Sequence, residues 1–223
     1  MTKVDVIILS NTANVEYYSI LRSCVLSLKE SQNVDPNIIL IETNKKLKDK
    51  SIMLPVDIFY IPDDTEFNYN KFLNYGLSFC KNNYICISNN DVIYDKNTLY
   101  TLTKNLDVYD SVSPWDLNTS HNFHKDRGIH EGYSTGSHIT GWCIVTKKTT
   151  IEKIGGKFDE QFSFWCQDDD YSMMLQTNGL KHALIGEATV IHSSGQSHKL
   201  FNKEDLHKQT LGLQPLFFQK WGK

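Results

Sequence analysis

The chain has 223 residues, of which 40% are hydrophobic, and a formal net charge of −3 at pH 7. This length and apolar content suffice for a real hydrophobic core, so we expect a single domain over residues 1–223. The small negative charge, without a basic block, argues against a protein that simply wraps nucleic acid. The five cysteines are widely spaced and never form a C-x-x-C pair, which indicates reduced core thiols rather than zinc ligands or a disulfide framework.

No apolar run approaches the length of a membrane span, and the N-terminus enters a strand pattern without a cleavable signal. We therefore expect a cytoplasmic protein with no membrane span. Among the 23 basic residues only Arg22 and Arg127 are arginine, a bias that is typical of AT-rich coding sequences. The cytoplasm is thus expected to be that of a bacterium, or of a host cell if the gene comes from a phage. The oligomeric state is not indicated.

The first 95 residues alternate between strand and helix patterns. Polar residues follow the first two apolar strands, and a right-handed βαβ connection brings both polar ends to one edge of the sheet. The order β-α-β-β-α-β is typical of a nucleotide-binding half-domain. We expect a lysine-rich connection over 45–50, helices over 17–30 and 67–80, and strands over 4–9, 38–41, 56–61 and 84–88.

The fourth of these strands ends in a polar group that is the first candidate for chemistry. Residues 84–88 have the pattern of a strand buried on both faces, and Asn89, Asn90 and Asp91 follow directly. Open α/β sheets bind their ligands at the carboxyl ends of their strands, which makes Asp91 a candidate site residue. The alternative is an ordinary Asn/Asp turn.

The pattern is looser after residue 96. Residues 116–137 are polar and irregular, which favours an acceptor loop or lid. The loop residues His121, His124 and His130 lack the spacing of metal ligands, so we expect solvated histidines. We expect helices over 99–106, 149–154 and 171–177, a docked C-terminal helix from residue 202 onward, and strands over 111–114, 141–145 and 188–192.

Two further features are candidates for chemistry. Asp168, Asp169 and Asp170 are adjacent carboxylates that precede a predicted helix. One of them can cap that helix, or one can have a raised pKa and act as a general base. His192 ends the last strand, where it is either a packed core residue or, with Asp91 and phosphate oxygens, part of an octahedral site for Mg²⁺ or Mn²⁺.

Nine segments, taken in order, are V-D-V-I-I-L-S-N-T, I-I-L-I-E-T-N, F-N-Y-N-K-F-L-N-Y-G-L, I-S-N-N-D-V, T-G-W-C-I-V, G-G-K-F-D-E-Q-F, Q-D-D-D-Y, V-I-H-S-S-G-Q-S and K-W-G. Together they resemble the inverting family-2 glycosyltransferases of the GT-A fold, over nearly the whole chain except residues 107–137. The resemblance implies an α/β, Rossmann-like fold with a central mixed, mostly parallel sheet flanked by helices. It divides the chain into a nucleotide-sugar-binding half (1–95), an acceptor and catalytic half (96–198) and a helical tail (199–223).

The resemblance also implies an activity. The protein would be a metal-dependent inverting glycosyltransferase that moves a sugar from a nucleotide diphosphate sugar, with UDP as the expected nucleotide, to a hydroxyl acceptor. Asp168 would be the catalytic base, and Asp91 and His192 would hold Mn²⁺ or Mg²⁺. Donor binding is implied for Ser10, Asn11, Glu42, Asn74 and Asn90, and sugar or acceptor contacts for Trp142, Trp165 and Asp169.

The sequence departs from the family pattern at two places. The D-x-D motif keeps only its last acid, because Asn89 and Asn90 replace the other positions. Gln167 stands where the E-D-x-D block usually has Glu, and if that alignment is one place off, Asp169 or Asp170 inherits the role of base.

The sequence leaves two possible acceptors, a glycan and a hydroxymethylated base in phage DNA. A DNA acceptor requires a basic surface, which the lysines at 147, 148, 153 and 157 would provide near the acceptor side. The alternative outside the enzymes is a nucleotide-sugar-binding protein without turnover, which the weakened D-x-D motif favours.

Overall fold

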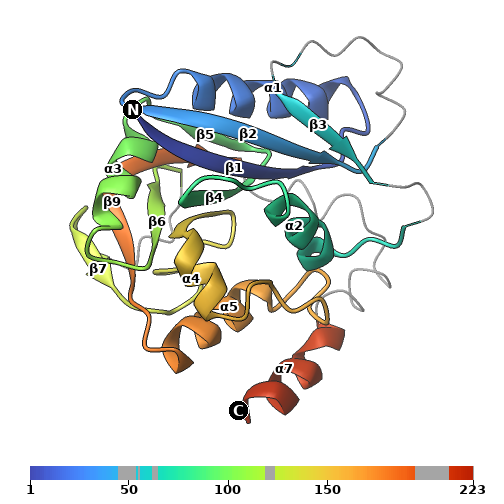
Figure 1. Cartoon of the computed structure of the whole chain (residues 1–223), viewed down its shortest axis with the longest axis vertical. Helices are drawn as coiled ribbons and strands as arrows, with labels where there is room; N and C mark the ends of the chain where they lie inside the picture. The colour runs from blue at the N-terminus through green and yellow to red at the C-terminus, as the bar shows by residue number, and fades with distance from the viewer. Residues whose placement is uncertain (45–53, 55, 62–64, 119–123, 194–210, 223) are drawn as a thin grey trace.

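The computed structural model describes residues 1–44, 54, 56–61, 65–118, 124–193 and 211–222. One continuous sheet runs through it in the strand order β3-β2-β1-β4-β8-β6-β9-β5, and β7 pairs with β9 (Figure 1). The strands are β1 (Thr2–Ser10), β2 (Val34–Glu42), β3 (Asp57–Tyr60), β4 (Tyr84–Asn89), β5 (Val92–Tyr94), β6 (Ser111–Asp116), β7 (Ile129–Glu131), β8 (Cys143–Lys147) and β9 (His182–His192). The helices are α1 (Val15–Lys29), α2 (Tyr69–Leu77), α3 (Thr98–Asn105), α4 (Lys148–Lys153), α5 (Gln167–Thr177), the 3₁₀ turn η3 (Leu211–Leu213) and α7 (Gln214–Trp221).

The first half of the sheet is parallel. β1 pairs in parallel with β2 on one side and with β4 on the other, and β2 pairs in parallel with β3. The register sets Ser10 opposite Glu42 and Leu9 opposite Asn89, so the polar residues that end three strands meet at one edge. The predicted strand–helix order of the first 95 residues is confirmed, and β5 follows it as a short addition.

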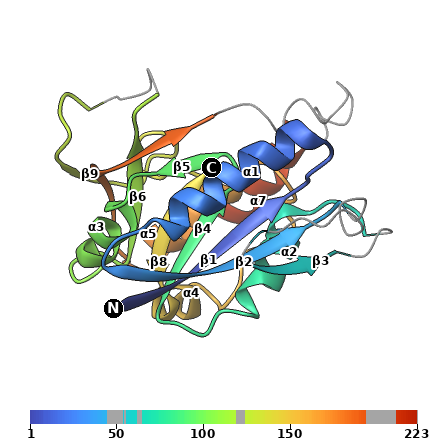
Figure 2. The ribbon, with the colours of Figure 1, turned by 90° about the horizontal axis from the view of Figure 1, so that it is seen from above.

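Alternation along the strands builds two separate cores. Val6 and Ile8 of β1 belong to the cluster that α1 and α3 cover, whereas Ile7 belongs to the cluster on the opposite face. That second cluster includes Phe72 of α2 and Leu175 of α5. Figure 1 shows α1 on one side of the sheet and α2, α4 and α5 on the other, and Figure 2 looks onto α1 where it crosses the strands. Burial on both faces explains why these strands are almost wholly apolar.

The second half of the sheet is mixed. β8 runs antiparallel to β4 and β6, β9 runs antiparallel to β5 and β7, and β6 and β9 are parallel. The expected mixed α/β sheet is confirmed, with its parallel pairs concentrated in the first half. The last strand is longer than expected, because β9 begins at His182, and β7 forms within the region expected to be irregular.

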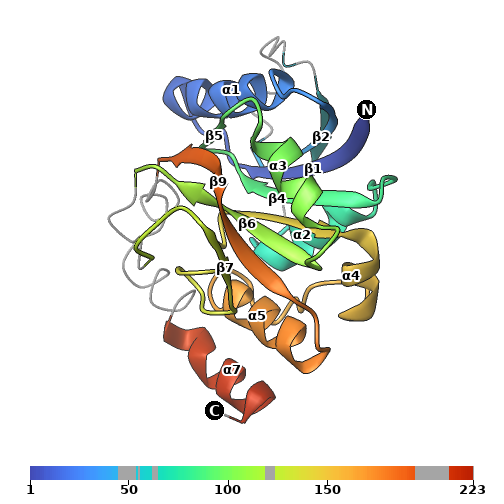
Figure 3. The ribbon, with the colours of Figure 1, turned by 90° about the vertical axis from the view of Figure 1, so that its left-hand side faces the viewer.

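The C-terminal helix α7 lies beyond α5, at the end of the molecule away from α1 (Figure 3). It falls within the tail that was expected to be helical from residue 202, whereas residues 202–210 and the lysine-rich connection 45–50 lie outside the described residues. All five cysteines are buried free thiols. In the described ranges, no helix combines the length and the apolar character that crossing a bilayer requires.

Candidate functional site

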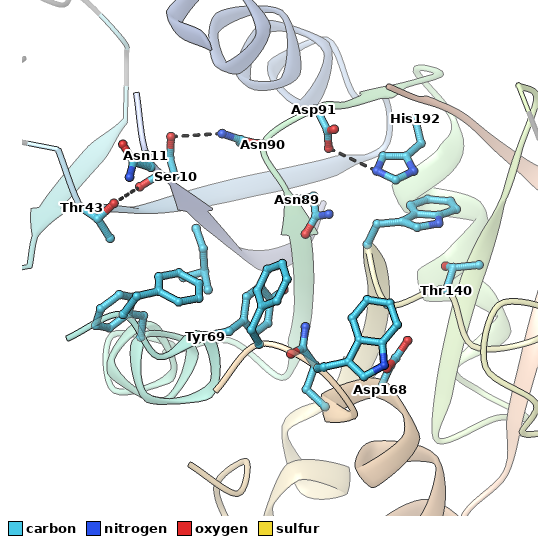
Figure 4. A pocket seen from close by; sticks show the side chains of 18 of the residues that line it. Ser10, Asn11, Thr43, Tyr69, Asn89, Asn90, Asp91, Thr140, Asp168 and His192 are labelled. Carbon is cyan, nitrogen blue, oxygen red and sulfur yellow. Dashed lines mark hydrogen bonds and ion pairs between the residues drawn. The ribbon is translucent and has the colours of Figure 1, made fainter. Parts of the chain in front are cut away.

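A cavity of about 720 Å³ opens at the carboxyl-terminal ends of β1 and β4 (Figure 4). This is the edge where open α/β sheets bind their ligands, and the volume lies within the range of small-molecule sites. The structure brings every site residue predicted from the sequence to this cavity except Glu42 and Asn74. Those that line it are Ser10, Asn11, Asn90, Asp91, Trp142, Trp165, Asp168, Asp169 and His192.

Ser10 and Asn11 lie at the end of β1, on one side of the cavity (Figure 4). The Asn90 side-chain amide donates a hydrogen bond to Ser10 Oγ (3.2 Å), and Thr43 Oγ1 donates to the Ser10 carbonyl oxygen (3.1 Å). The parallel register holds the two strand ends side by side, so these polar groups form one continuous rim. Hydroxyl and amide groups of this kind suit the hydrogen-bonding edges of a ribose or a base.

Asp91 directly precedes β5, and His192 ends the neighbouring strand β9. Val92 of β5 pairs with His192 of β9, and this register places the His192 Nε2 atom 3.3 Å from Asp91 Oδ1. The Trp142 ring stacks on the imidazole with a centroid separation of 4.8 Å, and the Asp116 carboxylate accepts a hydrogen bond from the His192 backbone N–H (3.1 Å). Both side chains are therefore held in place, with exposures of only 5% for Asp91 and 9% for His192.

The donor set at Asp91 fits a divalent cation. Asp91 Oδ1 is buried and accepts no hydrogen bond from the described residues, although a buried carboxylate oxygen ordinarily has such a partner. A cation with additional phosphate or water oxygens would satisfy it, and a carboxylate beside an imidazole suits Mn²⁺. Within the described residues no cluster of three or more His, Cys, Asp or Glu side chains forms a full metal cage. The described residues alone therefore supply at most part of the coordination sphere.

The three adjacent aspartates of α5 point to three different environments. They lie within the first turn of the helix, not before it as the sequence suggested, and consecutive helical positions differ by about 100°. Asp168 and Asp169 both line the cavity, but Asp169 Oδ1 already accepts a hydrogen bond from Thr135 Oγ1 (2.6 Å). Asp170 is buried and pairs with the C-terminal helix. This division favours Asp168 among the three as the group that is available to a substrate.

The Asp168 carboxyl has a pKa raised to about 6, first by burial and then by the charge of Asp169. Gly141 makes room for it: a Cβ atom at Gly141 would lie 2.9 Å from Asp168 Oδ2. Cys166, which precedes the helix, has a left-handed backbone with φ of 62°, an uncommon conformation for a residue other than glycine. The backbone turn that leads into α5, just before Asp168, is therefore conformationally constrained.

Glu42 and Asn74 do not line the cavity. The Glu42 carboxylate accepts hydrogen bonds from Thr12 Oγ1 (2.7 Å) and from the Asn44 backbone N–H (2.7 Å), which fixes the loops after β1 and β2. The Asn74 amide donates to the Phe158 carbonyl oxygen (2.9 Å) and accepts from its N–H (2.8 Å). Neither side chain belongs to the cavity lining, and a direct contact of either with the donor, which the resemblance implies, stays a prediction.

Two expectations about basic side chains are corrected. Lys147 pairs with Tyr84, at the opposite end of β4 from the cavity, because β8 is antiparallel to β4, and Lys148 follows it. The described residues that line the cavity include no lysine or arginine. The loop histidines are also not simply solvated, since the rings of His124 and His130 stack with centroids 4.0 Å apart; His121 lies outside the described residues.

Several cavity residues were not predicted from the sequence. Tyr69 and Phe67 belong to the quoted segment F-N-Y-N-K-F-L-N-Y-G-L, but only its Asn-x-Gly part was used. Thr135 and Gly136 bring the end of the expected acceptor loop into the cavity wall.

Comparison with known proteins agrees with this geometry. The sequence model of the family described as "Glycosyl transferase family 2" matches residues 7–170. The chain belongs to this family. The expected family and its GT-A fold are thereby confirmed. A comparison with curated protein sequences gives no significant match.

Among solved structures, the fold is similar to that of S. aureus TarS. The crystal structure of TarS 1–349 in complex with UDP-GlcNAc has a TM-score of 0.65 and 12% identity, over 90% of this chain and 62% of that one. TarS 1–349 alone gives 0.63 and 12%, over 85% and 59%, and the longer TarS structure gives 0.61 and 13%, over 85% and 36%. The chain thus spans less than two thirds of these structures, and at this identity the likeness concerns the fold.

Proposed function

We propose that this family-2 protein transfers a sugar from a nucleotide diphosphate sugar to a hydroxyl group of an acceptor glycan, with inversion at the anomeric carbon. The observation that carries the proposal is that Asp168 and the Asp91–His192 pair face one cavity from different sides (Figure 4). An inverting displacement needs a base for the acceptor on one side of the sugar and charge stabilisation for the leaving group on the other. UDP is the proposed nucleotide, since the similar TarS structure contains UDP-GlcNAc.

In the proposed reaction, Asp168 removes the proton from the acceptor hydroxyl as its oxygen bonds to the anomeric carbon. The bond between that carbon and the diphosphate oxygen breaks in the same step, so the nucleoside diphosphate leaves with its electron pair and the proton stays on Asp168. A carboxylate with a pKa of about 6 is ionised at neutral pH yet more basic than an ordinary aspartate. Direct displacement of this kind inverts the anomeric configuration.

Asp91 and His192 would hold the divalent cation, Mn²⁺ or Mg²⁺. When bound, the cation supplies positive charge that stabilises the departing diphosphate. Ser10, Asn11 and Asn90 would bind and orient the nucleoside on the rim that they share. The Trp142 ring stacks against His192, and it would shield that part of the cavity from water.

Replacement of the base tests the proposal. Asp168→Asn keeps the shape of the side chain and an oxygen for the Asp169 N–H (3.1 Å), but it cannot accept the proton. We expect transfer to fall by about 10²–10⁴-fold, with donor binding retained. Turnover measured by UDP release, beside donor affinity measured by calorimetry, checks this. Asp107→Asn, at an exposed position outside the described cavity lining, is the matched control, and normal turnover by Asp168→Asn, or a product with retained configuration by NMR, contradicts the mechanism.

The two alternatives have direct tests as well. A binding protein without turnover would not hydrolyse any nucleotide sugar, with or without Mn²⁺, whereas many transferases slowly transfer the sugar to water. A hydroxymethylated DNA acceptor is disfavoured because Lys147 and Lys148 lie at the far end of β4 from the cavity. Salt-sensitive binding of a duplex that contains the modified base would support the DNA acceptor instead.

A further inference from the structure

The turn that carries Asp91 is short and lies between two strands. β4 ends at Asn89 and β5 begins at Val92, so only Asn90 and Asp91 separate them. The Asp91 carbonyl oxygen accepts a hydrogen bond from the Ser193 N–H (3.1 Å), which fixes one side of the turn to the end of β9. Figure 4 shows Asn89, Asn90 and Asp91 along this edge of the cavity. The position of the Asp91 carboxylate therefore depends on how firmly the backbone on both sides of it is held.

A buried hydrogen-bond network joins the two strands across this turn. Tyr94 of β5 donates its hydroxyl hydrogen to Ser88 Oγ of β4 (2.7 Å), and Ser88 Oγ donates in turn to the Asn89 carbonyl oxygen (2.8 Å). We call these three residues the Tyr94 network. The Asn89 N–H donates to the Trp142 carbonyl oxygen (2.8 Å). The residue that leads into the turn is thus held through both of its backbone polar groups.

Packing alone does not require the hydroxyl of Tyr94. The side chain is buried in the apolar cluster that α1 and α3 cover, where a phenylalanine ring would fill the same space. The sulfur atoms of Cys143 (3.3 Å) and Cys86 (3.8 Å) also lie near the hydroxyl, but sulfur is a weak acceptor, which leaves Ser88 Oγ as the strong one. Burial raises the pKa of Tyr94 well above its ordinary value, so the hydroxyl stays protonated and remains a donor. Because a buried hydroxyl costs free energy unless it is hydrogen-bonded, its presence in this core indicates that the bond to Ser88 matters.

We propose that the Tyr94 network positions Asp91 to hold the divalent cation together with His192. This inference rests on the proposed function, because it concerns the cation site of that reaction. A shift of the Asn89 backbone would move Asp91, two residues further along, relative to His192, whose Nε2 atom is 3.3 Å from Asp91 Oδ1. Tyr94 and Ser88 are not part of the described cavity lining, so they act through the backbone and not through contact with a ligand.

Removal of a single oxygen atom tests the inference. Tyr94→Phe deletes the hydroxyl and keeps the ring, so the core retains its packing. We expect the affinity for Mn²⁺ in the presence of UDP to fall about 10–100-fold, as is typical when a group that orients a metal ligand is removed. The EPR signal of free Mn²⁺, titrated with the whole chain, measures this affinity without requiring turnover. Amide hydrogen exchange by NMR, in the absence of metal, should show faster exchange of the Asn89 N–H.

A second substitution shows whether the Tyr94 hydroxyl acts through Ser88. Ser88→Ala removes both the acceptor of Tyr94 and the donor to the Asn89 carbonyl oxygen, so we expect a similar loss of Mn²⁺ affinity. Because both hydroxyls belong to one network, the double variant should lose little more affinity than either single variant. Losses that simply add would mean that the two hydroxyls act independently, and they would overturn the inference.

Tyr171→Phe is the matched control. Tyr171 is also a buried tyrosine that donates to a buried serine, Ser111 Oγ (2.9 Å), but it belongs to the apolar cluster on the opposite face of the sheet. This variant loses the same kind of hydrogen bond and should keep its Mn²⁺ affinity. The inference is overturned if Tyr94→Phe binds Mn²⁺ as tightly as the wild type, if its Asn89 N–H exchanges no faster, or if Tyr171→Phe weakens Mn²⁺ binding as much.

The Mn²⁺ titration also separates this inference from the proposed function. A wild-type chain that binds no Mn²⁺ in the presence of UDP contradicts the cation site of the proposed function, and the inference falls with it. Equally tight binding by the wild type and by Tyr94→Phe leaves that site intact and overturns the inference alone. Turnover of Asp168→Asn, measured by UDP release, judges the proposed base independently of both.

Discussion

Two opposing effects act on the Asp168 carboxylate. It lies in the first turn of α5, where the helix macrodipole stabilises negative charge by about 0.3–1 kcal/mol. Burial and the neighbouring charge of Asp169 act in the other direction, and they prevail, since the pKa is raised to about 6. The local sequence therefore favours ionisation, while the tertiary surroundings oppose it and thereby make the group a stronger base.

This pKa predicts the pH dependence of activity. The base works only when it is ionised, so kcat/KM should be level above pH 7 and fall about tenfold per unit below pH 6. Initial rates from pH 4.5 to 8, with a check that the protein stays folded, measure this. An acidic limb near pH 4, the ordinary range for aspartate, would contradict the assignment.

The same shift predicts a cost in stability. The folded protein holds the Asp168 proton up to about pH 6, whereas the unfolded chain releases it near 3.8, so stability contributed by the proton is lost as pH rises through this window. Asp168→Asn should therefore raise the free energy of unfolding at pH 7 by on the order of 2 kcal/mol. The gain should shrink towards pH 4. Urea unfolding at both values checks this, and an equal gain at both would exclude the electrostatic origin.

Gly141 is expected to control where the Asp168 carboxylate points. An alanine Cβ would lie 2.9 Å from Asp168 Oδ2, which is the mobile end of a side chain and can move aside. Gly141→Ala should therefore keep the fold but lower turnover by about 10–100-fold through misplacement of the base. Steady-state kinetics with circular dichroism measures both effects. Gly128→Ala offers a comparison outside the described cavity lining, because its Cβ would also lie 2.9 Å from a carboxylate oxygen, Asp126 Oδ1. Unchanged turnover in Gly141→Ala would show that the Asp168 carboxylate adapts.

At the scale of elements, α7 fastens the first turn of α5. Lys220 Nζ lies 2.7 Å from Asp170 Oδ1 and 2.8 Å from Asp159 Oδ2, and the Trp221 indole N–H donates to Asp170 (2.8 Å). Asp170 is only two residues from Asp168, so the C-terminal helix is anchored to the same helical turn that carries the proposed base. The K-W-G segment quoted for the family resemblance thus has a physical role in the fold.

Removal of this anchor should destabilise the protein. Lys220→Met leaves the Asp170 carboxylate, 1% exposed, without its ammonium partner, and the expected loss is about 2–3 kcal/mol because Lys220 is itself partly exposed. Lys104→Met, on α3, is the matched control. Thermal and urea unfolding compare the two variants. Equal stability of both would mean that Asp170 is adequately satisfied by Trp221 alone.

For the whole molecule, the sheet brings together residues that lie far apart in the chain. Asp91 follows β4 and His192 ends β9, and they meet only because β5 pairs with β9. If this junction holds the cation on a nucleotide diphosphate, UDP-GlcNAc with Mn²⁺ should raise Tm, corresponding to about 2.7 kcal/mol at a ligand concentration of 100 Kd. EDTA should remove most of the shift. Asp91→Asn should do the same, and an unchanged shift in that variant would exclude Asp91 as a metal ligand.

The local sequence was enough to predict much of the fold. Continuous apolar runs and helical spacing identified the strands and helices of the first half, because side-chain periodicity is a local property. The sequence did not predict the short strands β5 and β7 or the first half of β9, because these strands form by pairing with partners far along the chain. The environment of the lysines at 147 and 148 was also misjudged, since strand direction follows from pairing and not from composition.

The sequence by itself determined the family, the α/β order and the acidic and histidine residues that are candidates for chemistry. Only the tertiary structure decided the surroundings of the three aspartates. Asp168 faces the cavity, Asp169 accepts a hydrogen bond from Thr135, and Asp170 forms an ion pair with Lys220 of α7. The physical reason is that helical rotation separates adjacent side chains, and what each one meets is supplied by distant segments. The spacing of residues in the sequence is enough to predict the direction in which each helical side chain points, but it does not predict which distant residues that side chain contacts.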